Sequence, residues 1–188
     1  DLSIMGRSAI DQSFRDREAK FYNDTYTRAI NGGYEKWNSS SYTWNSDVLV
    51  NYHKAFSDFV FDLNAGANHK QLEYQQIGGS GFVFNIENLF ALGNTANPRP
   101  FEDYSKKVVN SVYGVGELSY KNAIFLNITG RNDWSSALPS ASRSYFYPSV
   151  GLTAVISDLI TLPAVFTHVK LRGSFAQVGN DTGPYQLY

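Results

Sequence analysis

The residues best equipped for chemistry stand together at 131 to 134, where arginine, asparagine, aspartate and tryptophan follow one another. The guanidinium of Arg131 and the carboxylate of Asp133 can form an ion pair or hold a substrate. Short polar side chains such as Asn132 also hydrogen-bond to nearby backbone groups and fix the transition from a strand to a loop. We favour this structural role for the three polar residues, although the sequence leaves substrate binding open.

The other titratable residues form no recognised catalytic pattern. The histidines are His53, His69 and His168, which lie far apart in the sequence. Neither a nucleophile elbow nor an H-E-x-x-H motif is present. The chain has no cysteine, which excludes cysteine nucleophiles, disulfides and zinc–thiolate sites. We therefore predict that the chain is not an enzyme and holds no cofactor.

Two glycine-rich stretches, at 78–81 and 114–116, share only their composition with phosphate-binding loops. Neither leads into a helical pattern with the lysine that such a loop needs. The aspartates Asp103, Asp133 and Asp181 lack the spacing of a calcium-binding EF-hand. We predict no bound metal ion, and a calcium ion held by loop oxygens is the alternative left open.

All three tryptophans lie in or beside polar segments that we expect to be loops: Trp37, Trp44 and Trp134. Tyr34 and Tyr42 accompany them. Exposed aromatic faces can stack on the apolar C–H faces of sugar rings, but they also form girdles at membrane interfaces. For Trp44 we favour the girdle or packing between loops. Trp37 and Trp134 are our candidate substrate-contact residues.

Composition places the chain among β proteins. Its 188 residues carry a net charge of −1 without a Lys/Arg cluster, which argues against nucleic-acid binding. Aromatic residues make up 15% of the chain and there are 15 glycines, a mix that favours strands and turns. No run of about 18 to 20 apolar residues is present, as a membrane-spanning helix would need. The start at 1–4 does not resemble a signal peptide.

Alternation of apolar and polar residues predicts seven strands. The cleanest runs from Phe59 to Lys70, where Phe59, Phe61 and Leu63 share one face. We read Pro148 as a bulge or a strand end, because it lacks a donor for the strand ladder. The predicted strands are 2–11, 47–56, 59–70, 109–120, 123–131, 145–156 and 166–178.

The links between these strands alternate in length. Long polar links are expected at 13–45, 71–107 and 133–144, and shorter ones at 56–58, 120–122 and 157–165. Such sorting puts every long link at one end of the sheet, as in an outer-membrane β-barrel.

The face opposite the apolar residues is charged and polar, which requires water or ion pairing rather than a dry core. Seven antiparallel strands cannot close a barrel with an even strand count. We therefore predict an all-β fold, a transmembrane segment of a larger antiparallel barrel. The predicted polar face contains Arg7, Asp11, Asn51, His53, Asp62, Asn64, Glu117, Asn127, Arg131, Lys170 and Arg172.

Three landmarks in order resemble the SusC/RagA family of TonB-dependent outer-membrane transporters of Bacteroidetes. They are GRNDWSS at 130–136, SYFYPSVGLTAVIS at 144–157 and KLRGSFAQVGNDTGPY at 170–185. The resemblance is dense over 85–185 and looser before it. This chain departs from the family at Trp134, where glycine is usual, and at Tyr147, where the family has phenylalanine before the proline.

The resemblance implies a slice of a 22-stranded barrel and import of nutrients, either glycan oligosaccharides or peptides, across the bacterial outer membrane. It implies two protein partners, a SusD-like surface lipoprotein that caps the barrel and TonB, and contact with outer-membrane lipid. TonB would act through a plug domain and a TonB box that we do not find within residues 1–188. The alternatives are a passive outer-membrane porin and a soluble all-β glycan-binding module.

Overall fold

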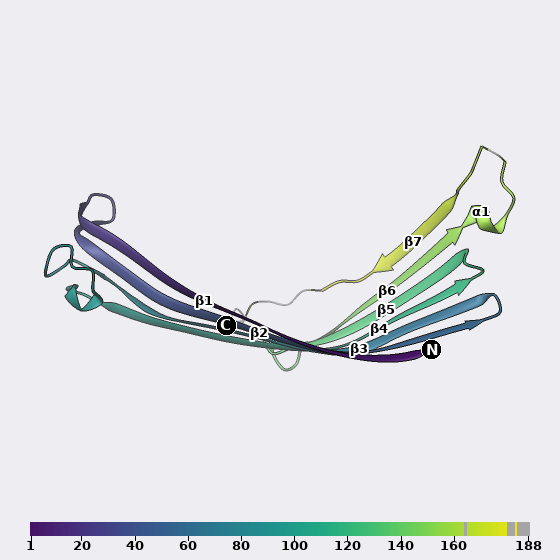
Figure 1. The fold of residues 1–188 in the computed structure, drawn as a ribbon, viewed down its shortest axis with the longest axis horizontal. Coiled ribbons are helices and arrows are strands. Elements are labelled where there is room, and N and C mark those ends of the chain that lie inside the picture. The colour runs from purple at the N-terminus through teal and green to yellow at the C-terminus, as the bar shows by residue number, and fades with distance from the viewer. Residues whose placement is uncertain (164, 180–182, 184–188) are drawn as a thin grey trace. The chain divides into compact units, whose positions relative to one another are not determined.

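The computed structural model describes residues 1–163, 165–179 and 183, and it forms one seven-stranded sheet in the order β1-β2-β3-β4-β5-β6-β7 (Figure 1). Each strand pairs with the strand that follows it in the chain. The strands are β1 Leu2–Thr25, β2 Ala29–Phe56, β3 Phe59–Phe82, β4 Arg99–Tyr120, β5 Ile124–Ser135, β6 Ser144–Val155 and β7 Lys170–Ala176. The two short helices are the 3-10 turn η1 Leu92–Asn94 and α1 Ile156–Leu159.

The prediction of a seven-stranded all-β sheet is confirmed, but two of the predicted long links are wrong. Most of 13–45 is strand, because β1 continues to Thr25 and β2 begins at Ala29. Likewise, β3 continues to Phe82, which leaves only 83–98 as a loop before β4. These extensions are polar on both faces, so they lack the apolar alternation by which strands are recognised in a sequence.

Pro148 is neither a bulge nor a strand end, so that prediction is also wrong. It pairs with Gly130 in an unbroken register between β5 and β6. The carbonyl oxygen of Pro148 accepts a hydrogen bond from the backbone N–H of Gln177, directly after the end of β7. The carbonyl and the ring nitrogen of one residue point to the same neighbour in an antiparallel strand. The missing N–H therefore costs nothing on the β5 side of the ladder.

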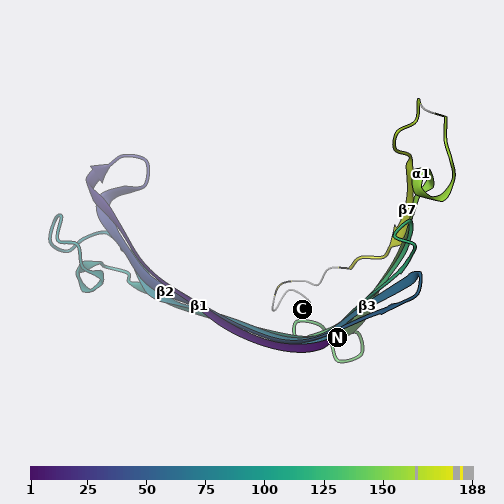
Figure 2. The same ribbon diagram turned by 45° about the vertical axis from the view of Figure 1, so that its right-hand side comes forward.

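The chain divides into two compact units. Unit 1 comprises 1–9, 44–70 and 107–188, and unit 2 comprises 10–43 and 71–106. Strands β1 to β4 run through both units, whereas β5, β6 and β7 belong to unit 1 alone. In unit 1 the chain leaves β6 through α1 and returns as β7 (Figure 2).

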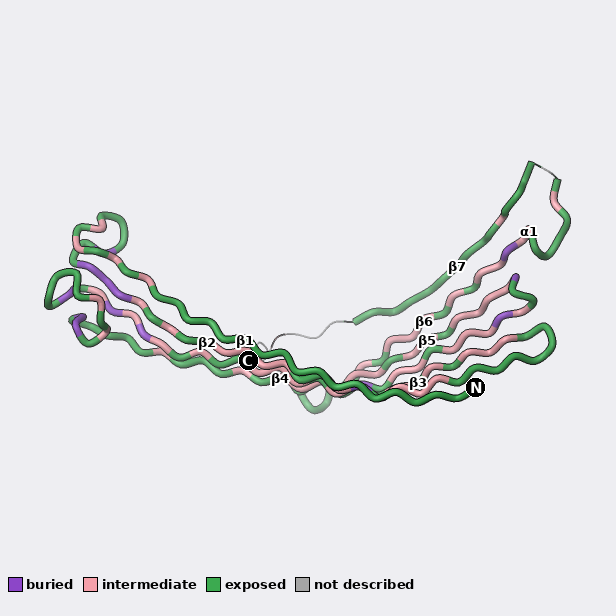
Figure 3. The backbone as a smooth tube through the Cα atoms, viewed as in Figure 1, coloured by how far each residue is buried: buried purple, intermediate pink, exposed green. Residues whose placement is uncertain are grey.

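Few residues along the strands of unit 1 are buried (Figure 3), and the exposed ones include large apolar side chains. Ile128 is 54% exposed, Leu152 52% and Phe175 65%. A water-soluble domain would bury such residues under a second layer of structure. The strands of unit 1 therefore have an apolar surface but no core in the described part of the chain.

Candidate functional site

The sheet of unit 1 has an apolar face. Paired residues share a face and successive residues alternate. The registers of β4 to β7 and the ring contacts Tyr52–Phe61 and Phe59–Tyr120 therefore define this face. It contains Val48, Val50, Tyr52 and Phe56 of β2; Phe59, Phe61, Leu63, Ala65 and Ala67 of β3; Val112, Leu118 and Tyr120 of β4; Ile124, Leu126 and Ile128 of β5; Phe146, Val150, Leu152 and Ala154 of β6; and Leu171 and Phe175 of β7.

The alternate residues form the polar face of unit 1. Its hydrogen bonds join neighbouring strands, such as Thr129 to Ser149 and His53 to Asp62. The polar face contains Arg7, Asp47, Asn51, His53, Asp62, Tyr113, Glu117, Asn127, Thr129, Arg131, Asp133, Tyr147, Ser149 and Arg172.

The apolar face has the length of a membrane-spanning strand. It runs over 48–56 on β2 and 59–67 on β3, close to the 9 to 11 or so residues that cross a bilayer as a tilted strand. Many of the alternate positions that continue this series into unit 2 are polar, although Ile30 and Ile77 are exceptions. Examples of the polar positions are Asn38, Ser40 and Glu73, and the change falls near Trp44. Only the unit 1 part of these strands is therefore fit to meet lipid.

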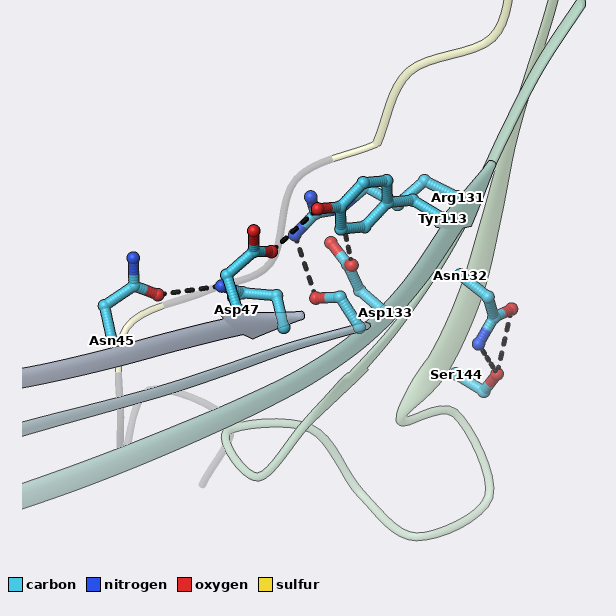
Figure 4. A network of polar contacts seen from close by, with 9 residues as sticks. Asn45, Asp47, Tyr113, Arg131, Asn132, Asp133 and Ser144 are labelled. Atoms are coloured by element: carbon cyan, nitrogen blue, oxygen red, sulfur yellow. Dashed lines mark hydrogen bonds and ion pairs between the residues drawn. The ribbon is translucent and has the colours of Figure 1, made fainter. Parts of the chain in front are cut away.

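The centre of the polar face is the buried carboxylate of Asp47, which is 8% exposed. Arg7 donates to it through Nη2 at 2.7 Å. The Tyr113 hydroxyl also donates to it, at 2.7 Å (Figure 4). Asn68 donates to the side chain of Asn45 beside it. A buried carboxylate is costly unless it is paired and hydrogen-bonded. The two donors from β1 and β4 meet this requirement.

Tyr113 reaches Asp47 only because residue 66 is a glycine. The Tyr113 ring on β4 passes over β3 to reach β2 at this point. A Cβ at Gly66 would lie 2.6 Å from the Tyr113 ring and hydroxyl, and 2.8 Å from the carbonyl oxygen of Val48. The missing side chain thus opens the path for a hydrogen bond that spans three strands.

The segment at 131–134 does not act as one cluster. Arg131 donates through Nε to Asp133 at 2.7 Å and through Nη2 to Ser111 at 2.8 Å, all on the polar face. Its guanidinium also lies 5.8 Å from the ring centroid of Tyr113. Asn132 lies on the opposite face and bonds Ser144 (Figure 4). These contacts support the structural role that we favoured from the sequence.

The two candidate substrate-contact tryptophans occupy different faces. Trp37, in unit 2, is half-buried between the Arg17 guanidinium, 4.7 Å from its ring centroid, and the Phe101 ring, 6.4 Å away. Trp134 pairs with Ser144 and is 39% exposed at the end of the apolar face. Trp44 contacts the ring of His69 at 5.1 Å, also on the apolar side.

In unit 2, the loop 83–98 packs against β1 and β2. Phe90 contacts the ring of Tyr22 at 4.8 Å and that of Tyr34 at 6.3 Å. The Tyr34 hydroxyl donates a hydrogen bond to the Glu18 carboxylate at 2.8 Å. This bond, together with the contact from Lys20, holds the pKa of the Glu18 carboxyl below its usual value. Burial raises the pKa of Tyr34. Asn94 ties the loop to itself through the backbone of 86 and 89. The loop is thus a folded surface, and the sequence showed no signal of it beyond its length.

Among the residues that the structure describes, no three acidic or histidine side chains gather where they could hold a metal ion. His53 bonds Asp62 and His69 bonds Asn110, on opposite faces of the sheet. No helix in the described ranges is long and apolar enough to cross a membrane.

Replacing Gly66 with alanine tests the path of Tyr113. The added Cβ overlaps the ring and a backbone carbonyl, so we expect Gly66→Ala to lower the free energy of unfolding by about 1 to 3 kcal/mol. Unfolding of the full-length protein in urea measures this. Gly116→Ala is the matched control, since a Cβ there meets nothing within 4 Å. Equal stability of the two variants would contradict the steric argument.

Among the comparisons with known proteins, only that with solved structures gives matches, and these matches share one fold. No protein-family model and no curated protein matches the chain. The structure of the RagAB peptide transporter matches with a TM-score of 0.85 at 19% identity, over 98% of this chain and 21% of that chain. The "closed-closed" state of the RagAB peptide importer gives 0.85 at 18% identity, and the "open-open" state 0.84 at 19%, with the same coverage.

This chain thus spans about a fifth of the solved chains that it matches. At this level of identity the match shows the fold. It confirms the fold implied by the SusC/RagA resemblance of the sequence landmarks, as far as the described residues reach. Residues 180–182, 184 and 185 of the third landmark lie outside them. In fold, the chain is an open, seven-stranded portion of a barrel wall like that of RagA.

Proposed function

We propose that residues 1–188 form part of the barrel domain of a SusC/RagA-type, TonB-dependent transporter in the bacterial outer membrane. The plug domain and the TonB box would belong to other parts of that protein. The observation that carries this proposal is the pair of opposed faces in unit 1, one apolar over the length of a bilayer and one charged. The structural match to RagAB supports the same assignment.

Each part of the chain has a role in this proposal. The apolar face meets the hydrocarbon of the membrane, and the polar face lines the barrel interior, where Arg7 and Asp47 compensate each other's charge. The strands and loop of unit 2 are suited to water rather than to lipid, because they carry many polar residues on both faces. No covalent chemistry is required of any residue.

The transported nutrient is a peptide or a glycan oligosaccharide. Peptides are supported by the structures that match, which are described as a peptide transporter and importer. By the same likeness, a SusD-like lipoprotein caps the barrel from outside and TonB supplies energy from the periplasm. Residues beyond this chain share in setting the substrate.

Energised transport separates this proposal from a passive porin. In cells that depend on the full-length protein for uptake of a labelled oligopeptide or oligosaccharide, loss of TonB should lower the uptake rate at least tenfold, since movement of the plug requires TonB. Uptake that continues unchanged without TonB would favour the porin. The exposed apolar face of unit 1 already speaks against the soluble glycan-binding module.

Trp37 is the residue in this chain that we propose to contact the substrate. In unit 2, the Arg17 guanidinium and the Phe101 ring flank the Trp37 ring on the side of the sheet away from Glu73. Trp134, the second candidate, stands at the end of the apolar face, where contact with the membrane interface suits it better.

Substituting Trp37 tests this assignment. Trp37→Ala should raise the KM for uptake roughly three- to tenfold, the loss expected for one aromatic contact, with little change in the maximal rate. Trp44→Ala is the control, because Trp44 is on the apolar side. A KM that rises equally in both variants, or in neither, would remove Trp37 from the substrate path.

A further inference from the structure

The apolar face of unit 1 is hollowed at one place. A groove of about 520 Å³ crosses β4, β5 and β6 there. Its floor contains Gly114, Gly116 and Gly130, and its walls include Ile128, Phe146 and Phe175. No charged side chain is among the lining residues.

The strand register explains why the groove exists. Gly114 pairs with Gly130, and Gly130 pairs with Pro148, so two neighbouring strands have no side chain at one level and the third has only the compact proline ring. Gly116 widens the groove on the same face of β4. A Cβ at Gly116 would meet nothing within 4 Å, and one at Gly114 would meet only the carbonyl oxygen of Asn64, at 3.8 Å. At Gly114 and Gly116 the missing side chains therefore leave open space, whereas Gly130 makes room for the Phe146 ring, which a Cβ there would approach to 3.1 Å.

A group of polar and aromatic residues, which we call the ledge, lies farther along the strands on the same face as the groove. Asn110, Trp134 and Ser144 form one cross-strand row four residues beyond the glycine row, or about 13 Å at the usual rise of a strand. His69 bonds Asn110 at 2.7 Å, and Asn132 donates to Ser144 at 3.0 Å. The ledge thus offers aromatic rings and hydrogen-bonding groups at the end of an otherwise apolar surface.

We propose that this groove holds one acyl chain of a membrane lipid, with the lipid's head group against the ledge formed by His69, Asn110, Asn132, Trp134 and Ser144. The inference rests on the proposed function, which places the apolar face in the bilayer. Each end of the site fits one end of a lipid. The apolar walls of the groove would lack van der Waals contacts if the groove stayed empty, and an acyl chain supplies these contacts. The ledge lies where the apolar face ends, which is where a lipid head group would lie.

A second barrel packed on this face is the rival occupant. It would have to fill the groove with its own side chains and bury a much wider area, of the order of 800 Å² per partner. The pairs His69–Asn110 and Asn132–Ser144 already bond each other, so the ledge needs no protein partner. A single acyl chain fills the groove without that wide contact, so the observations favour the lipid.

Native mass spectrometry of the full-length protein, extracted from vesicles of dimyristoylphosphatidylcholine, tests the proposal. We expect one lipid to remain bound at collision energies that remove all others. Gly116→Leu fills the groove and should lower the retained fraction at least tenfold, and Gly116→Ala should lower it less. Gly173→Leu adds the same side chain to the apolar face outside the groove, where a Cβ meets nothing within 4 Å, and should retain the lipid.

The possible outcomes test the lipid site in the groove and the proposed function of the barrel independently. Equal lipid retention in Gly116→Leu and Gly173→Leu, or no retained lipid in the natural protein, would overturn the inference. A lipid-free dimer that Gly116→Leu splits would overturn it in favour of a second copy. Insertion into the vesicles is scored separately, by the resistance of the barrel to unfolding in detergent. Failure of the natural protein to insert would contradict the proposed function, whereas insertion without a retained lipid contradicts only the groove.

Discussion

A sheet that borders hydrocarbon on one side and water on the other must pair all its backbone hydrogen-bonding groups. Its two faces must also carry different side chains, apolar toward the hydrocarbon and polar toward the water. No water is available in the bilayer to hydrogen-bond a free N–H or C=O, so strands cross it only within a closed barrel. The sheet described here has two edge strands, β1 and β7. On our proposal, these edges require neighbouring strands from the rest of a barrel. On our proposal, the apolar face and the polar face are both consequences of this one constraint.

The charged side of the sheet is organised around Asp47. Arg7 reaches it from the neighbouring strand, and Tyr113 reaches it across β3 because Gly66 has no side chain. Arg131 forms a second centre with Asp133 and Ser111. In both centres the charge is matched within the wall itself. The polar face can therefore line a wet interior without leaving a buried charge unpaired.

The sequence predicted what alternation can reveal. Phe59 to Lys70 and the strand after Ala123 were recognised because one face is apolar, and the family landmarks lie at the end of β5 and along β6 and β7. The parts of β1 to β3 in unit 2 were taken for loops, since polar residues occur on both faces of these strands. Examples are Glu18, Asn38 and Glu73. Pro148 was misjudged because the side to which its nitrogen points depends on the register. The path of Tyr113 over Gly66 could not be foreseen, since it joins residues on three strands. The proposed substrate contact at Trp37 stays untested.

The assignment of the two faces can be measured directly on β5. The chain contains no cysteine, so single cysteines placed from Phe125 to Thr129 in the full-length protein can each carry a spin label in lipid vesicles. Our account predicts that labels at Leu126 and Ile128 are accessible to oxygen dissolved in the bilayer. Labels at Phe125, Asn127 and Thr129 should be shielded from the lipid. Accessibility that does not alternate along the strand, or labels at Leu126 and Ile128 that meet a water-soluble nickel reagent instead, would contradict the account.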